Sequence, residues 1–163
     1  MKSLVKYAAL AAAIVVGGQA NAGTATTSFN AKITIVAACS ITTPADLDFG
    51  STGLITANID QTTTMNVTCT NTTPYNIGLD KGANGASVSA RVMKHTSLAA
   101  TVPYSLYSNS GRTNNWGNTI GTDTLAGTGT GTSQTITVYG RVAPQAAPTP
   151  GSYTDAVNVT LTY

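Results

Sequence analysis

Short stretches in which apolar and polar residues alternate recur along the chain, separated by clusters of glycine, proline and asparagine. Successive residues of a β-strand point to opposite faces of a sheet, so this alternation is typical of strands with one buried face. Beyond position 22 we find no segment with helical periodicity. The sequence therefore predicts an all-β fold of six or more short strands, as in a β-sandwich. The clearest strands are expected at 29–36, 65–70, 75–79, 104–106, 136–142 and 157–163.

Polar connections are expected between these strands. Segments 81–87, 108–118 and 121–133 are interpreted as flexible loops, the last because it contains the low-complexity run 127–132. Prolines in 143–151 predict an extended connection into the final strand. Within the second loop, Trp116 is interpreted as a packing residue over the end of the sandwich, with contact to a sugar or a surface as the alternative.

The segment 1–22 has the pattern of a secretory signal peptide. Lys2 and Lys6 precede an apolar run at 8–16, and the tripeptide Ala20-Asn21-Ala22 follows. The run is shorter than the roughly 20 residues that a membrane anchor needs. We expect cleavage after Ala22, so that the mature chain is 23–163.

Charge is sparse and balanced after this leader. Of eight Lys and Arg residues, two lie in the leader, so six cations face six acidic residues, all of them Asp. A nucleic-acid partner would need a clustered basic surface, so no nucleic-acid partner is expected. A net charge near zero does little to keep molecules apart, which suits a protein that associates.

The two cysteines, Cys39 and Cys69, lie in the exported part of the chain. An even count in an oxidising compartment predicts one disulfide. A metal pair and a redox pair are the alternatives, but there is no C-x-x-C and His95 is the only histidine.

No catalytic constellation is found. Asp46 and Asp48 lie beside a turn at Phe49-Gly50 and are interpreted as turn residues, while His95 is expected in an exposed loop. The sequence contains neither G-x-S-x-G nor H-E-x-x-H. We therefore predict that the protein is not an enzyme and that it has no cofactor and no metal site.

The two ends of the mature chain suggest how it associates. The final alternating strand runs to Tyr163, with no residues left for a closing partner strand, and the N-terminal stretch 23–35 is strand-like and free of proline. An open sheet edge is a liability that proteins cover, and a strand from a neighbouring molecule can cover it. Alternation alone does not decide whether 29–35 is such a donor strand or the first strand of its own sandwich.

Several motifs of the sequence, taken together, resemble those of a known family. The leader, the N-terminal segment with Cys39, and Leu47-Asp48-Phe49-Gly50 are similar to the start of a chaperone–usher pilin. The stretches 104–107, 138–144, 151–155 and 157–163 resemble the spore coat protein U domain of archaic chaperone–usher pilus subunits. The resemblance covers essentially the whole mature chain.

This resemblance implies an incomplete immunoglobulin-like sandwich (37–163) that lacks its last strand, preceded by a donor segment (23–36). A periplasmic chaperone would fill the groove first, and the next subunit's donor would replace it at an outer-membrane usher. The donor side chains implied are Phe29, Ala31, Ile33 and Ile35. The residues implied on the acceptor side are Val157, Val159 and Leu161 in one groove wall, and Tyr163 at the terminus that the chaperone engages.

The function implied is that of a structural subunit in a homopolymeric cell-surface fimbrium, exported through the periplasm and mediating adhesion and biofilm formation. Two alternatives stay open. One is a coat or matrix protein of a resistant cell form. The other is a sugar-binding tip adhesin, for which the mature chain 23–163 leaves no room for an added receptor domain.

Overall fold

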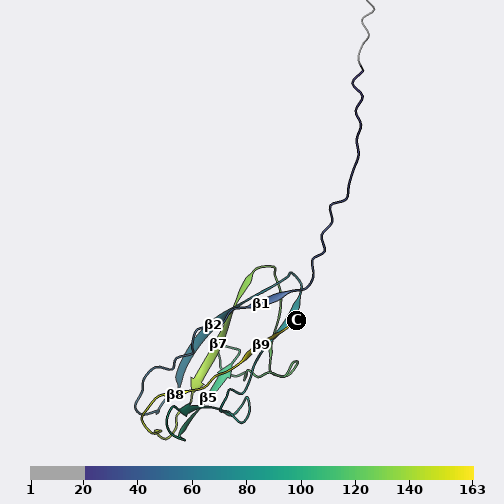
Figure 1. Ribbon diagram of the computed structural model, residues 1–163. Coiled ribbons are helices and arrows are strands. Elements are labelled where there is room, and N and C mark those ends of the chain that lie inside the picture. The colour runs from purple at the N-terminus through teal and green to yellow at the C-terminus, as the bar shows by residue number, and fades with distance from the viewer. Residues whose placement is uncertain (1–20) are drawn as a thin grey trace, which may run out of the picture. The chain divides into compact units, whose positions relative to one another are not determined.

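The structure is a computed structural model that describes residues 21–163. This part of the chain contains nine strands and no helix, so the predicted all-β fold is confirmed (Figure 1). No helix that could cross a membrane therefore occurs between residues 21 and 163. Apart from its last two residues, the predicted signal peptide (1–22) lies outside the described residues.

The chain divides into two units, residues 1–34 and 35–163. In the first unit, the described residues 21–34 form neither helix nor strand. The strand expected at 29–36 is therefore not formed in this structure, because a strand needs partners for its backbone N–H and C=O groups. The alternation of apolar and polar residues in 29–36 is therefore a property of the sequence alone in this structure.

The second unit consists of two antiparallel sheets. In chain order the strands are β1 (Cys39–Ile41), β2 (Ile59–Cys69), β3 (Pro74–Leu79), β4 (Arg91–His95), β5 (Thr101–Tyr107), β6 (Leu125–Thr128), β7 (Ser133–Val142), β8 (Tyr153–Thr154) and β9 (Val159–Thr162). The larger sheet has the order β1-β2-β7-β5-β4-β8, and the smaller one has the order β6-β3-β9. Figure 1 shows β2 and β7 side by side, paired from Ile59 opposite Val142 to Thr68 opposite Ser133.

The apolar faces of the two sheets form one core. Alternate residues of β2 (Met65, Val67 and Cys69) are at most 1% exposed, and they meet Ile77 and Leu79 of β3 in a single cluster. This burial of every second residue is what the sequence pattern predicts for a sandwich strand. The fold class inferred from alternation therefore holds for the second unit.

The disulfide between Cys39 and Cys69 is present, as predicted. The two residues are directly opposite each other in the pairing of β1 with β2. A cross-link across 30 residues stabilises a fold by roughly 3–4 kcal/mol on the chain-entropy model. The bond fixes the three-residue strand β1 to the longest strand of the sandwich.

The expected loop at 121–133 is partly wrong, because β6 forms within it and pairs with β3. Gly127 of the low-complexity run is paired with Tyr75, and a Cβ at this glycine would lie 2.4 Å from Cζ of the tyrosine ring. Glycine is therefore needed here for close packing against the aromatic ring. The repetitive sequence does not indicate this packing.

The interpretation of His95 as a loop residue is also wrong. His95 ends β4 opposite Tyr153 of β8, and its Nδ1 accepts hydrogen bonds from the N–H groups of Ser97 and Leu98. The ring thus closes the turn after β4.

The strand around Tyr104 begins at Thr101, before Pro103.

Two residues with little signal in the sequence for an interior position are fully buried. Trp116 is 0% exposed, and its Nε1 donates to the carbonyl of Ile77 at 2.8 Å. Arg91 is also 0% exposed, and its guanidinium donates to four backbone carbonyls. Trp116 is therefore a packing residue, as predicted, but it lies in the core and not merely over its end.

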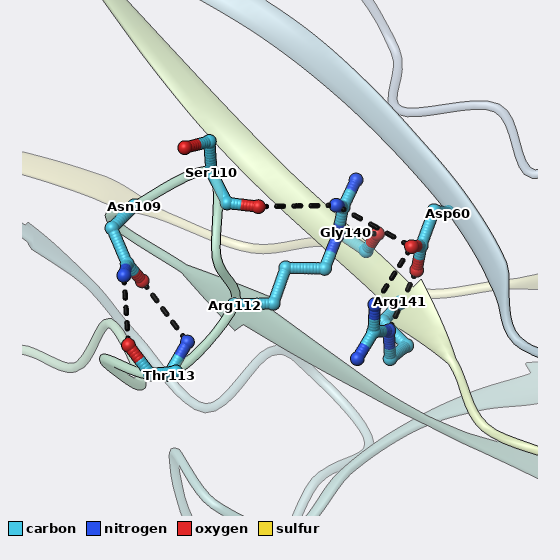
Figure 2. Close-up of polar contacts among 7 residues, drawn as sticks. All are labelled: Asp60, Asn109, Ser110, Arg112, Thr113, Gly140 and Arg141. Atoms are coloured by element: carbon cyan, nitrogen blue, oxygen red, sulfur yellow. Dashed lines mark hydrogen bonds and ion pairs between the residues drawn. The ribbon is translucent and has the colours of Figure 1, made fainter.

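A surface network ties the loop at 108–114 to the larger sheet (Figure 2). Asp60 of β2 accepts two hydrogen bonds of 2.7 Å from Arg141, directly opposite on β7. Arg112 adds an ion pair of 3.4 Å to Asp60 and donates to the carbonyl of Gly140. The hydrogen bonds from Arg141, with the two positive charges, hold the pKa of Asp60 below its ordinary value.

Candidate functional site

A groove of about 840 Å³ lies between the first and the last segments of the sandwich. We call residues 41–49 its first wall and residues 153–159 its second wall. Its floor consists of side chains of the central strands, namely Thr63, Met65, Leu79, Met93, Tyr104, Leu106 and Val138. The floor side chains that belong to the core are at most 7% exposed. The accessible apolar surface of the groove therefore comes from half-buried residues of its walls and floor, namely Leu47, Phe49, Met93, Tyr153, Val157 and Val159.

The first wall follows β1 and is held against β2. Thr42 donates its N–H to the carbonyl of Asn66, and the Thr63 hydroxyl donates to the carbonyl of Ala45 at 2.7 Å. Further along, Leu47 and Phe49 pack over Gly140 of β7, where a Cβ would lie 2.5 Å from Leu47 and 2.9 Å from Phe49. A residue larger than glycine at 140 would therefore displace this wall.

Two carboxylates hold the second wall to the loop that follows β3. Asp80 accepts hydrogen bonds from the N–H and the side-chain amide of Asn158 at 3.0 and 2.6 Å. Asp155 accepts from the N–H and the side-chain amide of Asn84, and from the Tyr104 hydroxyl at 2.7 Å. Burial and the bond to Asp155 raise the pKa of Tyr104, so this hydroxyl remains a donor.

Asp80 makes the second wall sensitive to acid. Burial alone would raise the pKa of Asp80, but the hydrogen bonds from Asn158 and Gly82 hold it below its ordinary value of 3.8. A carboxylate whose folded pKa is lowered stabilises the fold above its unfolded pKa, and this stabilisation is lost as the pH falls through the folded pKa.

We therefore expect Asp80→Asn to lower the free energy of unfolding by about 1 kcal/mol at neutral pH, since the site is partly exposed. The difference from the unaltered protein should shrink as the pH falls below about 4. Urea unfolding of both proteins between neutral and acidic pH measures this. Asp46→Asn is the control, because it removes an exposed carboxylate that accepts no hydrogen bond from residues 21–163. An equal loss in both variants would contradict the assignment.

The groove lies beside two free strand edges. β1 is one of the two edge strands of the larger sheet, the other being β8, and β9 is one of the two edge strands of the smaller sheet, the other being β6. No other strand among residues 21–163 pairs with the outer side of either. An edge strand presents unpaired N–H and C=O groups that can bind an added strand.

The predicted acceptor residues are distributed unevenly. Val157 and Val159 line the groove. Leu161 is half-buried against the core, opposite Ile77, but it is not among the groove-lining residues, and neither is Tyr163, which is 59% exposed. The first residues of the predicted strand 157–163 therefore line the groove, while its last residues lie outside the groove.

The predicted donor side chains are exposed in the structure. Phe29, Ile33 and Ile35 are 91%, 84% and 72% exposed, and Ala31 is exposed as well. Exposure of three large apolar side chains at odd-numbered positions is unfavourable in water. They have the spacing that a groove between two sheets accepts.

Sequence reasoning missed the first wall and most of the floor. Leu47 and Phe49 carried a signal, because they are apolar at alternate positions between exposed aspartates. Tyr153 and Met93 carried none, since only tertiary structure brings β4 and β8 to the groove. Within residues 21–163 there is no cluster of three or more metal-ligating side chains.

Almost the whole described chain is similar in sequence to known proteins. The Spore Coat Protein U domain family matches residues 25–160. Protein U of Myxococcus xanthus is 32% identical over 178 residues, covering 100% of this chain and 98% of that protein.

Among solved structures, the chain is similar to one in the CsuC–CsuE chaperone–tip adhesion subunit pre-assembly complex, from the archaic chaperone–usher Csu pili of Acinetobacter baumannii. The TM-score is 0.58 at 22% identity over 80% of this chain. The similarity spans 40% of that longer chain, and it shows a shared fold.

Proposed function

Because the chain belongs to the Spore Coat Protein U domain family, we propose that it is a structural subunit of an archaic chaperone–usher pilus, assembled by donor-strand exchange. Residues 1–22 are removed on export, 23–36 act as the donor and 37–163 form the acceptor sandwich. The groove beside the edge strands β1 and β9 carries this proposal, since an added strand would cover its half-buried apolar side chains and pair with a free strand edge.

The lengths of donor and groove support the proposal. Six residue steps separate Phe29 from Ile35, and six steps separate the ends of the second wall, 153 and 159. At about 3.3 Å per step, both span at most about 20 Å. The donor has no proline, so each of its N–H groups can join a ladder with β1 or β9.

The gains and the costs of inserting the donor strand are of similar size. Burying Phe29, Ile33 and Ile35 contributes about 4–9 kcal/mol at about 1.5–3 kcal/mol each. Ladder hydrogen bonds add about 0.5–1.5 kcal/mol each, while ordering the donor opposes insertion by about 1–2 kcal/mol per residue. The persistence of the fibre then rests on slow release of the strand.

The partners proposed are identical subunits, a periplasmic chaperone that occupies the groove before assembly, and an outer-membrane usher. The chaperone complex of the solved neighbour supports the first step. The fibre is displayed at the cell surface and contributes to adhesion and biofilm formation. This role is structural and needs no catalytic group.

Deletion of residues 23–35 tests the proposal. The truncated chain is expected to remain bound to its chaperone but to form no fibres, because it keeps an acceptor groove and has no donor. Electron microscopy of the producing cells and co-purification with the chaperone measure the two properties. Fibres formed by the truncated chain would refute the donor role.

A coat or matrix protein is the second candidate, favoured by the family name and by the near full-length similarity to Protein U. Strand exchange could build either structure. Immunogold labelling of the producing cells separates them, since a pilus gives thin extended fibres and a coat gives a continuous layer.

A further inference from the structure

The charged side chains that line the groove are all acidic. Its lining includes Asp46, Asp48 and Asp155 but no Lys, Arg or His. From residue 23 onward the chain holds six aspartates and six Lys or Arg residues. Half of the acidic side chains therefore gather at one groove, although the mature chain as a whole is neutral.

Two of the three carboxylates have no cation beside them in the described part of the chain. Asp155 lies in the field of the buried Arg91 and is engaged by Tyr104. Every ion pair within residues 21–163 involves Asp60. Lys94 is exposed and follows the groove-lining Met93 on β4, so it points to the opposite face of its sheet. The charges of Asp46 and Asp48 thus remain uncompensated.

These two carboxylates lie along the solvent rim of the first wall. Leu47 and Phe49 are half-buried over Gly140, while Asp46 and Asp48 are exposed. Asp48 uses only Oδ1 in a hydrogen bond, which it accepts from the N–H of Gly50 at 2.8 Å. In the first wall, apolar side chains therefore pack toward the sheet, and carboxylates lie at the opening of the groove.

The donor segment carries the complementary charge. Residues 23–36 contain one charged side chain, Lys32, and no acidic one. Alternation places Lys32 on the face opposite Phe29, Ile33 and Ile35. When these apolar side chains enter a groove, the ammonium group of Lys32 faces its rim.

We propose that pairing of Lys32 with Asp46 and Asp48 selects the strand that the groove accepts, the occupant being residues 23–36 of a second copy of this chain. The inference rests on the proposed function and adds a specificity determinant to it. Charges at the rim of an interface act mainly on the association rate, and like charges exclude wrong partners. Salt weakens both effects, since the Debye length is about 8 Å at physiological ionic strength.

A charge exchange between two full-length variants tests this. The first is Lys32→Asp. The second combines Asp46→Lys with Asp48→Asn, which keeps a side-chain oxygen for the Gly50 turn. Each is exported, purified with its disulfide intact, unfolded and diluted into buffer, and polymerisation is followed by light scattering and electron microscopy.

Each variant alone is expected to polymerise about tenfold more slowly than the unaltered chain. Lys32→Asp makes both exposed charge pairs repulsive, while the second variant makes one pair repulsive and removes the other. An equal mixture should recover the original rate, since each donor then meets a groove of opposite charge. Lys32→Arg should behave as the unaltered chain. Lys94→Asp at an exposed position of β4 makes the same change in net charge as Lys32→Asp and controls for it. Raising the salt from about 0.05 M to about 0.5 M should slow the unaltered chain and shrink all differences.

The outcomes separate this inference from the proposed function. If Lys32→Asp polymerises at the original rate, or the mixture is no faster than its components, charge selection is wrong while strand exchange stands. If the unaltered chain forms no polymer, or Ile33→Asn polymerises as well as it does, the donor role itself fails. A folding rate independent of protein concentration, with monomers as the product, would show that the occupant is the chain's own segment. Circular dichroism of each variant verifies folding, and the salt series on the unaltered chain needs no variant.

Discussion

Replacement of Arg91 by leucine is expected to lower the free energy of unfolding by about 3–5 kcal/mol. The guanidinium is 0% exposed, and it donates to the carbonyls of Leu79, Asp80, Val88 and Trp116 at 2.8–2.9 Å. Leucine would leave these acceptors without their donor, and each unsatisfied buried group costs about 1–3 kcal/mol. Denaturant unfolding measures the change.

Lys94→Leu is the matched control, since Lys94 is an exposed cation on the same strand. Its effect should stay within about 0.5 kcal/mol. Arg91 also joins the end of β3 to the loop that contains Trp116, so its loss should increase amide exchange at both places. A variant as stable as the unaltered chain would show that the four hydrogen bonds contribute nothing net.

Ile33→Asn in the donor segment is expected to weaken strand insertion by a factor of at least about 60. Loss of a buried apolar side chain removes about 1.5–3 kcal/mol, and burying an unpaired amide adds about 1–3 kcal/mol. Each 1.4 kcal/mol is about tenfold in the equilibrium constant. The yield of fibres and their resistance to heat in detergent measure the effect.

Thr34→Asn supplies the control at the neighbouring position. It introduces the same amide on the opposite face of the donor, where it stays in water, and it should leave polymerisation unchanged. Neither substitution changes charge, so the pair is independent of the rim carboxylates. Equal effects at 33 and 34 would mean that the segment does not insert with one face inward.

Local patterns in the sequence predicted the elements of the sandwich well. The strands around Val67, Ile77 and Val138 were found from alternation, because the period of two is a local property of the chain. The disulfide followed from two cysteines in an exported chain. The family resemblance inferred from short motifs is confirmed by the match over residues 25–160.

The candidate site was predictable only in part. The family resemblance implied that Val157, Val159 and Leu161 line a groove, and in the structure Val157 and Val159 line one while Leu161 does not. The sequence of the first wall predicted that Asp46 and Asp48 are turn residues. The low-complexity run predicted a loop at 121–133, so β6 was not expected. The assignment of Phe29 to Ile35 as a donor remains a proposal, since it concerns a second molecule.

The sequence by itself determined the fold class, the cross-link and the apolar spacing of both terminal segments, because each depends on residues close in the chain or on simple counts. Only the tertiary structure decided the burial of Arg91 and Trp116 and the gathering of three aspartates at one groove. Burial and charge clustering depend on which strands become neighbours. Residues as distant in the sequence as Asp46 and Asp155 line one groove only when the sheets have packed.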